Sequence, residues 1–129
     1  MPFAAKMNDQ VIGMDTHVVM VVTPGGTVPT SLPNPFSGTI TGGCSTNVTI
    51  DGQAAATVGS TATNKPSHVP QGGSFQTPPT NSGKVLQGST SVFINGKPAA
   101  RVNDPVQTCN DPVPAATSKI VGASTVQIA

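Results

Sequence analysis

The stretch SVFINGKPAARVND, residues 91–104, decides the fold. Val92 and Ile94 alternate with other residues before Asn95-Gly96, and a second short run ends at Asn103-Asp104. Apolar residues two apart lie on one face of a β-strand. Asn-Gly suits a type I′ turn, whose two central residues need positive φ and whose twist matches the flanking strands. The stretch therefore predicts a tight β-hairpin.

The same hairpin occurs a second time, and its first strand occurs a third time. Residues 43–60, GCSTNVTIDGQAAATVGS, match residues 87–104, QGSTSVFINGKPAARVND, at a constant offset of 44 (87 minus 43), with Asp51-Gly52 in place of the Asn-Gly turn. The C-terminal residues 121–129, VGASTVQIA, begin a third copy and stop after its first strand. No copy is apparent in residues 1–38. A repeat of this kind sets the architecture of the chain.

Composition bounds the class of protein. The 129 residues fit one domain, 9% are charged, and the net charge is +1; ordinary globular domains carry about 25% charged residues. Neither nucleic acid nor an anionic membrane is an expected partner. With no Trp, no Tyr and four Phe, the core must be thin, so a metal or a partner is expected to help stabilise it. No window has helical periodicity, and we predict an all-β fold with little or no helix.

Hairpin-like units of this size are marginal alone, so we expect three of them to bury their faces around one axis with approximate threefold symmetry. The single domain then divides into an irregular first unit (1–38), two repeats (39–83 and 84–118) and a closing strand (119–129). Val18–Val22 is a candidate strand. Polar loops rich in Pro, Gly, Ser and Thr are expected at 23–38, 60–83 and 104–118.

Four residues suit a metal site: His17, Cys44, His68 and Cys109. Imidazole and thiolate are good zinc ligands, and four of them close a tetrahedral site. His68 and Cys109 lie in corresponding loops after the two hairpins, and His17 lies in the first unit, so all three are expected to converge at one end of a threefold body. Cys44 falls inside a predicted strand, where a packed thiol is the expected role.

A catalytic site is not expected. A hydrolytic zinc keeps an open position and a nearby carboxylate as general base, for which Asp15 and Asp104 are candidates. Asp104, however, is interpreted as a turn residue at the hairpin exit, and no Ser-His-Asp set is present. Arg101, the single arginine, is expected to make a structural hydrogen bond or salt bridge there. We therefore predict no enzyme and no catalytic residues.

Targeting signals are also missing from the sequence. The first ten residues, MPFAAKMNDQ, lack an apolar signal core. The longest aliphatic run, Val18–Val22, is too short to span a bilayer, which takes about 20 residues. The chain is expected to start in the cytoplasm, where two cysteines favour metal ligands or plain thiols over a disulfide.

The stretch Pro98-Ala99-Ala100-Arg101 carries a family resemblance. The chain resembles the PAAR-repeat family, the sharp tips of type VI secretion systems and related contractile injection machines. The match is closest to the PAAR segment of Rhs-type effectors, through GMDTHVVMVVTPGGTVPTSLPNPFSG (13–38), VGSTATNKPSHVPQGGSFQ (58–76), GSTSVFINGKPAARVND (88–104) and QTCNDP (107–112).

The resemblance implies a β cone whose base caps a trimeric VgrG-like spike and whose point carries one structural zinc. In the family, three histidines and one cysteine hold this zinc. His17, His68 and Cys109 match family ligands, whereas Asn34 stands where relatives tend to have the remaining histidine. The fourth ligand is left open between Asn34, Cys44 and a water.

The resemblance further implies a mechanical function in piercing the target envelope. Expected partners are one trimeric spike per tip and, as a further candidate, effector proteins for delivery; no nucleic acid and no stable membrane anchor are expected. The tip would be assembled in the bacterial cytoplasm and then ejected with the spike to the exterior or the target cell. Because the chain ends at Ala129, a stand-alone tip without a toxin is expected, although a segment cut from a longer effector is not excluded.

Three alternatives remain at this point. A phage or tailocin baseplate tip would use the same physics in another particle. A small zinc hydrolase is less favoured. A small β domain of other binding role, with its His and Cys unliganded, is the third.

Overall fold

The protein is all-β, as predicted from its sequence. A computed structural model describes residues 2–111 and 113–129; Pro112, the last residue of the QTCNDP segment, lies outside the described residues. None of the described residues is helical, so no membrane-spanning helix is found among them. The strands of the described chain are β1 (Gln10–Thr23), β2 (Gly26–Gly42), β3 (Thr49–Ile50), β4 (Gln53–Ala54), β5 (Thr61–Asn64), β6 (Gly73–Phe75), β7 (Ser82–Val85), β8 (Phe93–Ile94), β9 (Lys97–Pro98), β10 (Pro105–Thr108) and β11 (Ala115–Val121).

Six strands close into a small antiparallel barrel. They follow the order β1-β2-β5-β7-β10-β11, and β11 pairs back onto β1. The barrel thus consists of three antiparallel strand pairs: β1 with β2 is the first, β5 with β7 the second, and β10 with β11 the third. Its interior is filled by alternating inward residues, among them Val11, Phe36, Ile40, Ala62, Val85, Val106 and Ile120. Closure leaves the lower part of the sheet without free edges.

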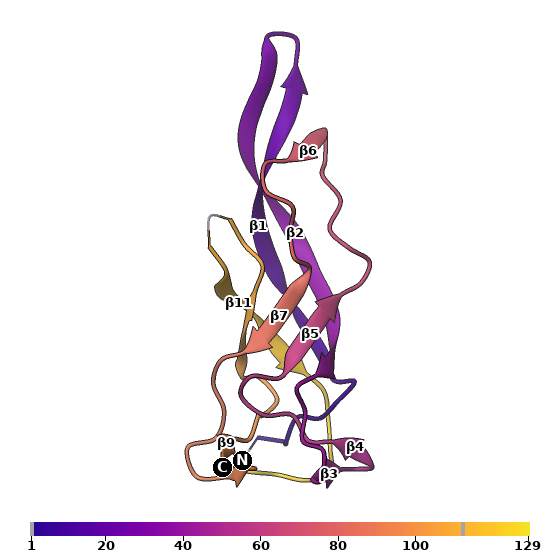
Figure 1. Ribbon diagram of the computed structural model, residues 1–129, viewed down its shortest axis with the longest axis vertical. Helices are drawn as coiled ribbons and strands as arrows, with labels where there is room; N and C mark the ends of the chain where they lie inside the picture. Colours follow the sequence, from indigo (N-terminus) through magenta and orange to yellow (C-terminus); the bar gives the residue numbers. More distant parts are fainter. Residues whose placement is uncertain (1, 112) are drawn as a thin grey trace.

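The first strand pair is much longer than the other two. β1 and β2 stay in register from Gln10↔Thr39 to Thr23↔Gly26, and their far end projects beyond the rest of the molecule (Figure 1). β6 adds a short third strand to β1 in this projecting part, with Val19 opposite Phe75. The result is an elongated body with a narrow hairpin at one end.

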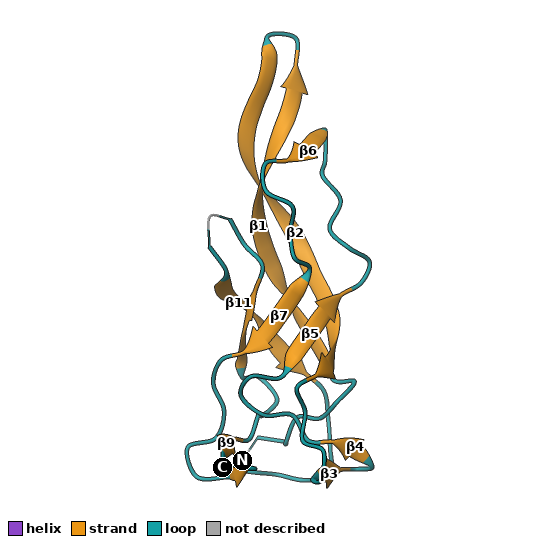
Figure 2. Ribbon diagram, in the orientation of Figure 1, coloured by secondary structure: helices purple, strands orange, loops and turns teal. Residues whose placement is uncertain are grey.

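The broad base is built from the repeated hairpins. β3 pairs with β4 and β8 pairs with β9, and both turns have positive φ at their two central residues, Asp51-Gly52 and Asn95-Gly96. This confirms the predicted type I′ geometry. Loops connect these short strands, and both ends of the described chain lie at this base (Figure 2). Bonds from Thr125 to the Asp51 carboxylate hold the C-terminal segment to the first turn, and they lower the pKa of Asp51.

The N-terminal residues supply the part of the third hairpin that the C-terminal copy lacks. Phe3 pairs with Gln127, and Ile128 N donates to Pro2 O at 2.9 Å. The inner face of the base accordingly takes one isoleucine and one alanine from each unit, with Val48 and Val92 packed against them: Ile50 with Ala55, Ile94 with Ala99, and Ile128 with Ala4. The predicted inward faces of the two hairpins are confirmed.

Three alanines form a ring of hydrogen bonds around the threefold axis. Ala5 N donates to Ala100 O at 2.9 Å, Ala100 N donates to Ala56 O at 3.0 Å, and Ala56 N donates to Ala5 O at 3.1 Å. The ring shows that FAAKMND (3–9) is a copy of PAARVND (98–104), which the sequence comparison missed in residues 1–38. Small side chains are needed because the three backbones meet here; all three alanines are fully buried.

The loop predicted at 23–38 is wrong, because most of it belongs to β2. Pro29, Pro33 and Pro35 share one parity of the strand and are exposed. Ser37 lies at an alternate position in the same series; its N–H donates to Asn64 Oδ1 and its carbonyl accepts from Lys65 N. The backbone N–H and C=O groups at these alternate positions therefore point away from β1. A proline is tolerated where its missing N–H faces an open edge. The three prolines therefore lie in a strand without breaking its pairing to β1.

The loops predicted at 60–83 and 104–118 are correct only in part. The first contains β5 and β6 and the start of β7, and the second contains β10 and most of β11. Their short alternating patterns, such as Thr61–Asn64 with Ala62 and Asn64 inward, are small and polar rather than aliphatic. Cys44 was expected inside a strand, but it follows the end of β2.

Candidate metal centre

Two residues of β1 begin the site. Asp15 and His17 are two apart, so they face the same side of the strand, and they are 0% and 1% exposed. Val11 and Val19 lie inward along the same strand, whereas Met14 is half exposed. The inward row of β1 thus changes from apolar to chemically active midway along its length.

His68 lies in the segment between β5 and β7, which we call the strap (residues 65–81). Asn81, at the end of the strap, has a left-handed backbone with φ 56°. Its side chain accepts from His68 N at 2.8 Å and from Asn64 Nδ2 at 3.2 Å. These bonds fold the strap back on itself and direct the His68 ring inward.

Cys109 follows β10 in a loop that is tied to β1. Asn110 Oδ1 accepts from Thr16 N at 2.6 Å, Asp111 Oδ2 accepts from Val18 N at 2.8 Å, and Asp111 N donates to Thr16 O at 2.8 Å. These contacts fix the buried thiol beside the inward row of β1.

The structure brings the four side chains together. One ligand atom from each of Asp15, His17, His68 and Cys109 lies within 4.8 Å of the others. His68 Nε2 is 2.9 Å from Asp15 Oδ2, and Cys109 Sγ is 3.4 Å from the same oxygen. Ligands of a tetrahedral zinc, at about 2.0–2.3 Å from the ion, are roughly 3.3–3.8 Å apart. The group therefore has the dimensions of a site for a single ion.

His17 provides the observation that fits a metal best. Both of its ring nitrogens are buried and make no hydrogen bond within the described residues. Asp111 Oδ2 lies 3.4 Å from Nδ1, but this oxygen already accepts from Val18 N. The ring packs against His68 and Phe75, with centroids 5.0 and 5.7 Å away. Because a buried polar atom without a partner is costly, an ion taking one lone pair would satisfy one of the two ring nitrogens.

The chemistry of Cys109 fits the same interpretation. Burial, followed by the adjacent Asp15 carboxylate, raises the pKa of the Cys109 thiol to about 11. A thiol with this pKa keeps its proton at neutral pH unless a cation takes its place. Metal ligands bind in their deprotonated forms, so binding at this cluster would release a proton. The cluster is compatible with a metal ion.

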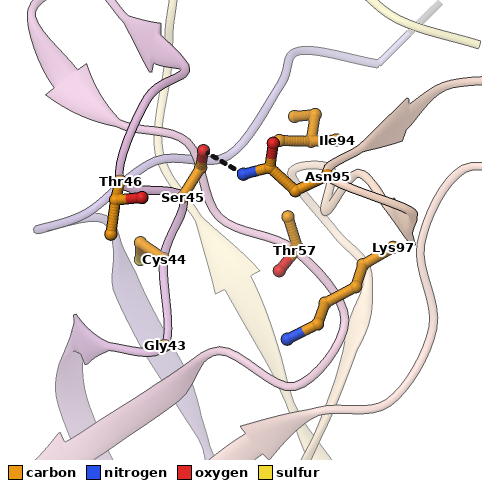
Figure 3. Close-up of a pocket in the computed structure, with 8 residues that line it drawn as sticks. All are labelled: Gly43, Cys44, Ser45, Thr46, Thr57, Ile94, Asn95 and Lys97. Carbon is orange, nitrogen blue, oxygen red and sulfur yellow. Dashed lines mark hydrogen bonds between the residues drawn. The ribbon is translucent and has the colours of Figure 1, made fainter.

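The residues left open as the fourth ligand lie differently. Asn34 is opposite Asp15 in the register of β1 and β2, and its Nδ2 donates to Leu32 O at 3.1 Å. Cys44 is not part of the cluster. It lines a cavity of about 110 Å³ at the base with Ser45, Asn95 and Lys97 (Figure 3). Burial raises the pKa of this thiol as well.

Sequence reasoning considered Asp15 only as a general base, and the structure places it among the four clustered side chains. The signal that could have found it is its spacing of two residues from His17 in a strand. Asp104 is not in this cluster. It accepts from Arg101 N at 2.7 Å and Arg101 Nη2 at 2.9 Å, as expected for a turn at the hairpin exit.

The cluster does not lie at the extreme point of the molecule, contrary to expectation. β1 continues six residues past His17 to Thr23, which at about 3.3 Å per residue is roughly 20 Å. His17, expected only within the irregular first unit, lies in strand β1. The group formed by Asp15, His17, His68 and Cys109 therefore lies between the shorter strand pairs and the middle of the long hairpin.

Comparison with known families agrees with the fold. Residues 75–129 match the family model described as the PAAR motif. No curated protein matches the chain. The match covers the second hairpin, Cys109 and the closing strand, and it supports the prediction of a PAAR-repeat protein. The family match supports a spike-tip type of function, with a spike protein as partner, rather than an enzymatic one.

Proposed function

We propose that this chain is the zinc-stabilised tip of a bacterial type VI secretion or related contractile injection system. The observation that carries the proposal is the threefold base made by one chain, with its ring of alanine hydrogen bonds. A trimeric spike offers three equivalent chain ends. A base in which three units of one chain repeat the same backbone pattern is suited to cap them with one copy.

The base also offers groups that a partner can cover. Phe93 is 57% exposed and Phe3 is 38% exposed, although neighbouring residues of both belong to the buried inner face. Within residues 2–111 and 113–129, the hairpins β3–β4 and β8–β9 form two-stranded sheets with no further strand beside them. Such open edges are templates for further strand pairing. Docking on a VgrG-like trimer would cover both the aromatic side chains and the edges.

Zinc is the proposed ion because of the ligand set. Two imidazoles, a thiolate and a carboxylate are groups that tetrahedral zinc accepts, whereas Ca²⁺ and Mg²⁺ prefer oxygen ligands alone. When bound, zinc would supply cross-linking energy for folding. His17 would hold β1, His68 the strap and Cys109 the loop after β10, so a single ion would connect segments far apart in sequence.

In the proposed sequence of events, the tip assembles on the spike in the bacterial cytoplasm and leaves with it when the machine contracts. The projecting β1–β2 hairpin is then the leading part that meets the target envelope. Effector proteins attached to the tip or its loops would be delivered with it.

The test is co-purification with a candidate trimeric spike, with stoichiometry measured by light scattering. One tip per spike trimer is expected. Phe93→Asp, at the base, should abolish the complex because it places a charge in the interface. Val28→Asp, near the hairpin end where Val28 is 48% exposed, is the matched control and should leave binding intact. Equal binding by both variants, or three tips per trimer, would contradict the proposal.

A further inference from the structure

We infer that Asp15 is the fourth metal ligand, through Oδ2, in place of the histidine that the resemblance leads one to expect at position 34. The inference rests on the proposed metal-stabilised tip and specifies its site. The resulting set, one carboxylate, two imidazoles and one thiolate, differs from three histidines and one cysteine.

The position of Oδ2 is the first argument. Asp15 is fully buried, and its Oδ2 lies between two of the other ligands, 2.9 Å from His68 Nε2 and 3.4 Å from Cys109 Sγ. The same oxygen therefore already stands within the ligand group, and little movement is needed for it to coordinate.

The other carboxylate oxygen, Oδ1, is held in place by side chains from β10, the loop after it and β11. Oδ1 accepts a hydrogen bond from the Thr108 hydroxyl, from Thr117 Oγ1 at 3.2 Å and from Asn110 Nδ2 at 3.4 Å. All three donors are neutral. They fix the orientation of the carboxylate and leave Oδ2 to face the cluster, as expected for a ligand that coordinates through one oxygen while hydrogen bonds hold the other.

Charge balance is the second argument. A fully buried carboxylate costs several kcal/mol unless a cation compensates it. Among the described residues no lysine or arginine forms a salt bridge with Asp15, and the contact of its Oδ2 with a basic side chain is the one to His68 Nε2 at 2.9 Å. A divalent cation together with the Asp15 carboxylate and the Cys109 thiolate gives zero net charge, with the two imidazoles neutral.

The alternative ligands fit less well. Asn34 offers a neutral amide oxygen, and its Nδ2 is committed to Leu32 O. Cys44 lines the base cavity and donates to Gly42 O at 3.7 Å. Neither supplies the negative charge at the cluster that Asp15 already does.

The experiment measures zinc affinity of the full chain by competition with a chromophoric chelator, and the visible absorption of Co²⁺-loaded protein. Asp15→Ala should weaken zinc binding by more than about 100-fold, because it removes a ligand. Thr108→Val should weaken zinc binding by only ~10–100-fold, as is typical for a residue that hydrogen-bonds to a ligand without binding the metal itself. Asp15→Ala and Asp15→Asn should both change the Co²⁺ spectrum. Asn34→Ala and Cys44→Ser are the matched controls and should keep wild-type affinity and spectrum.

Asp15→Asn preserves the shape of the side chain, so it carries the test if Asp15→Ala fails to fold. Unchanged zinc affinity and Co²⁺ spectrum in Asp15→Asn would overturn the inference and leave Asp15 as a hydrogen-bond partner of His68. A larger loss in Asn34→Ala than in either Asp15 variant would also overturn it. In both cases the proposed function still stands if the wild-type protein binds zinc and the spike. A wild-type chain that binds no zinc would instead refute the metal itself.

Discussion

At the scale of single residues, one turn is used three times at the exit of the base hairpins. Lys6 N donates to Asp9 Oδ2, Thr57 N to Ser60 Oγ, and Arg101 N to Asp104 Oδ2. The residue before each acceptor has positive φ: Asn8, Gly59 and Asn103. Arg101 adds side-chain bonds to Asp104, and Lys6 adds one to Asp9. The motif's arginine is therefore a structural residue, as its position beside Asn103-Asp104 indicated.

The three turns supply a graded test at position 104. Asp104→Ala removes the acceptor of the Arg101 backbone and side chain, and we expect it to lower the free energy of unfolding by about 1–3 kcal/mol. Asp104→Ser should cost less, because Ser60 performs the backbone part of this task in the equivalent turn. Urea unfolding measures both. Equal losses in the two variants would show that the backbone bond contributes nothing measurable.

For the site, sequence reasoning reached three of the four clustered residues. His17, His68 and Cys109 were found because the repeat placed two of them in corresponding loops. Asp15 was not grouped with them, since a carboxylate two residues from a histidine is informative only when both are known to lie in one strand. The predicted strand began only at Val18, because three polar residues, Asp15-Thr16-His17, directly precede the aliphatic run.

At the scale of elements, the base hairpins could be predicted from the sequence, whereas strand β2 could not because of its prolines. The hairpins at 49–54 and 93–98 were predictable because Asp-Gly and Asn-Gly specify the turn. β2 was not, since three prolines normally mark a loop. Whether a proline interrupts a strand depends on which side its nitrogen faces, and this is decided by the partner strand rather than by local sequence.

If the proposed zinc site is correct, the strap (residues 65–81) depends on the ion that His68 would bind. It is held at one end by His68 in the cluster and further along by β6, with Gln76 N donating to Val18 O and Val22 N to Gly72 O. Few aliphatic side chains anchor it, and Val69 is 68% exposed. Removing zinc with a chelator should therefore speed amide hydrogen exchange in residues 65–81, because local opening no longer breaks a metal bond.

Exchange at the base provides the internal control. The amides of Ala5, Ala56 and Ala100 lie in the alanine ring and should exchange at unchanged rates after chelation. Uniform acceleration in strap and base would indicate global destabilisation, and no change in the strap would show that the cluster does not hold it.

At the scale of the whole molecule, a repeat of small hairpins gives a closed body without a large core. Closure of six strands and a threefold base replace the aromatic residues that the sequence lacks. The threefold arrangement was predictable from the two hairpins and the C-terminal strand. The N-terminal contribution was not, because FAAKMND shares only part of its letters with PAARVND, and the relation becomes clear from the matching hydrogen bonds.

The long hairpin extends beyond the closed barrel, and there the outer flank of β2 from Thr27 to Pro35 is free of a neighbouring strand among the described residues. Two copies of the protein could pair edge to edge along such flanks. Pro29, Pro33 and Pro35 remove three of the N–H groups that this pairing would require, so they oppose self-association of the chain.

Changing these three prolines to threonine should accordingly yield dimers or larger assemblies in size-exclusion chromatography with light scattering, while threonine at the loop positions Pro70 and Pro114 should leave the chain monomeric. A triple variant that stays monomeric at high concentration would show that the prolines are dispensable. If they are needed, the proposed tip function requires sides of the hairpin that cannot pair with another copy, so that each tip remains a single particle until the machine contracts.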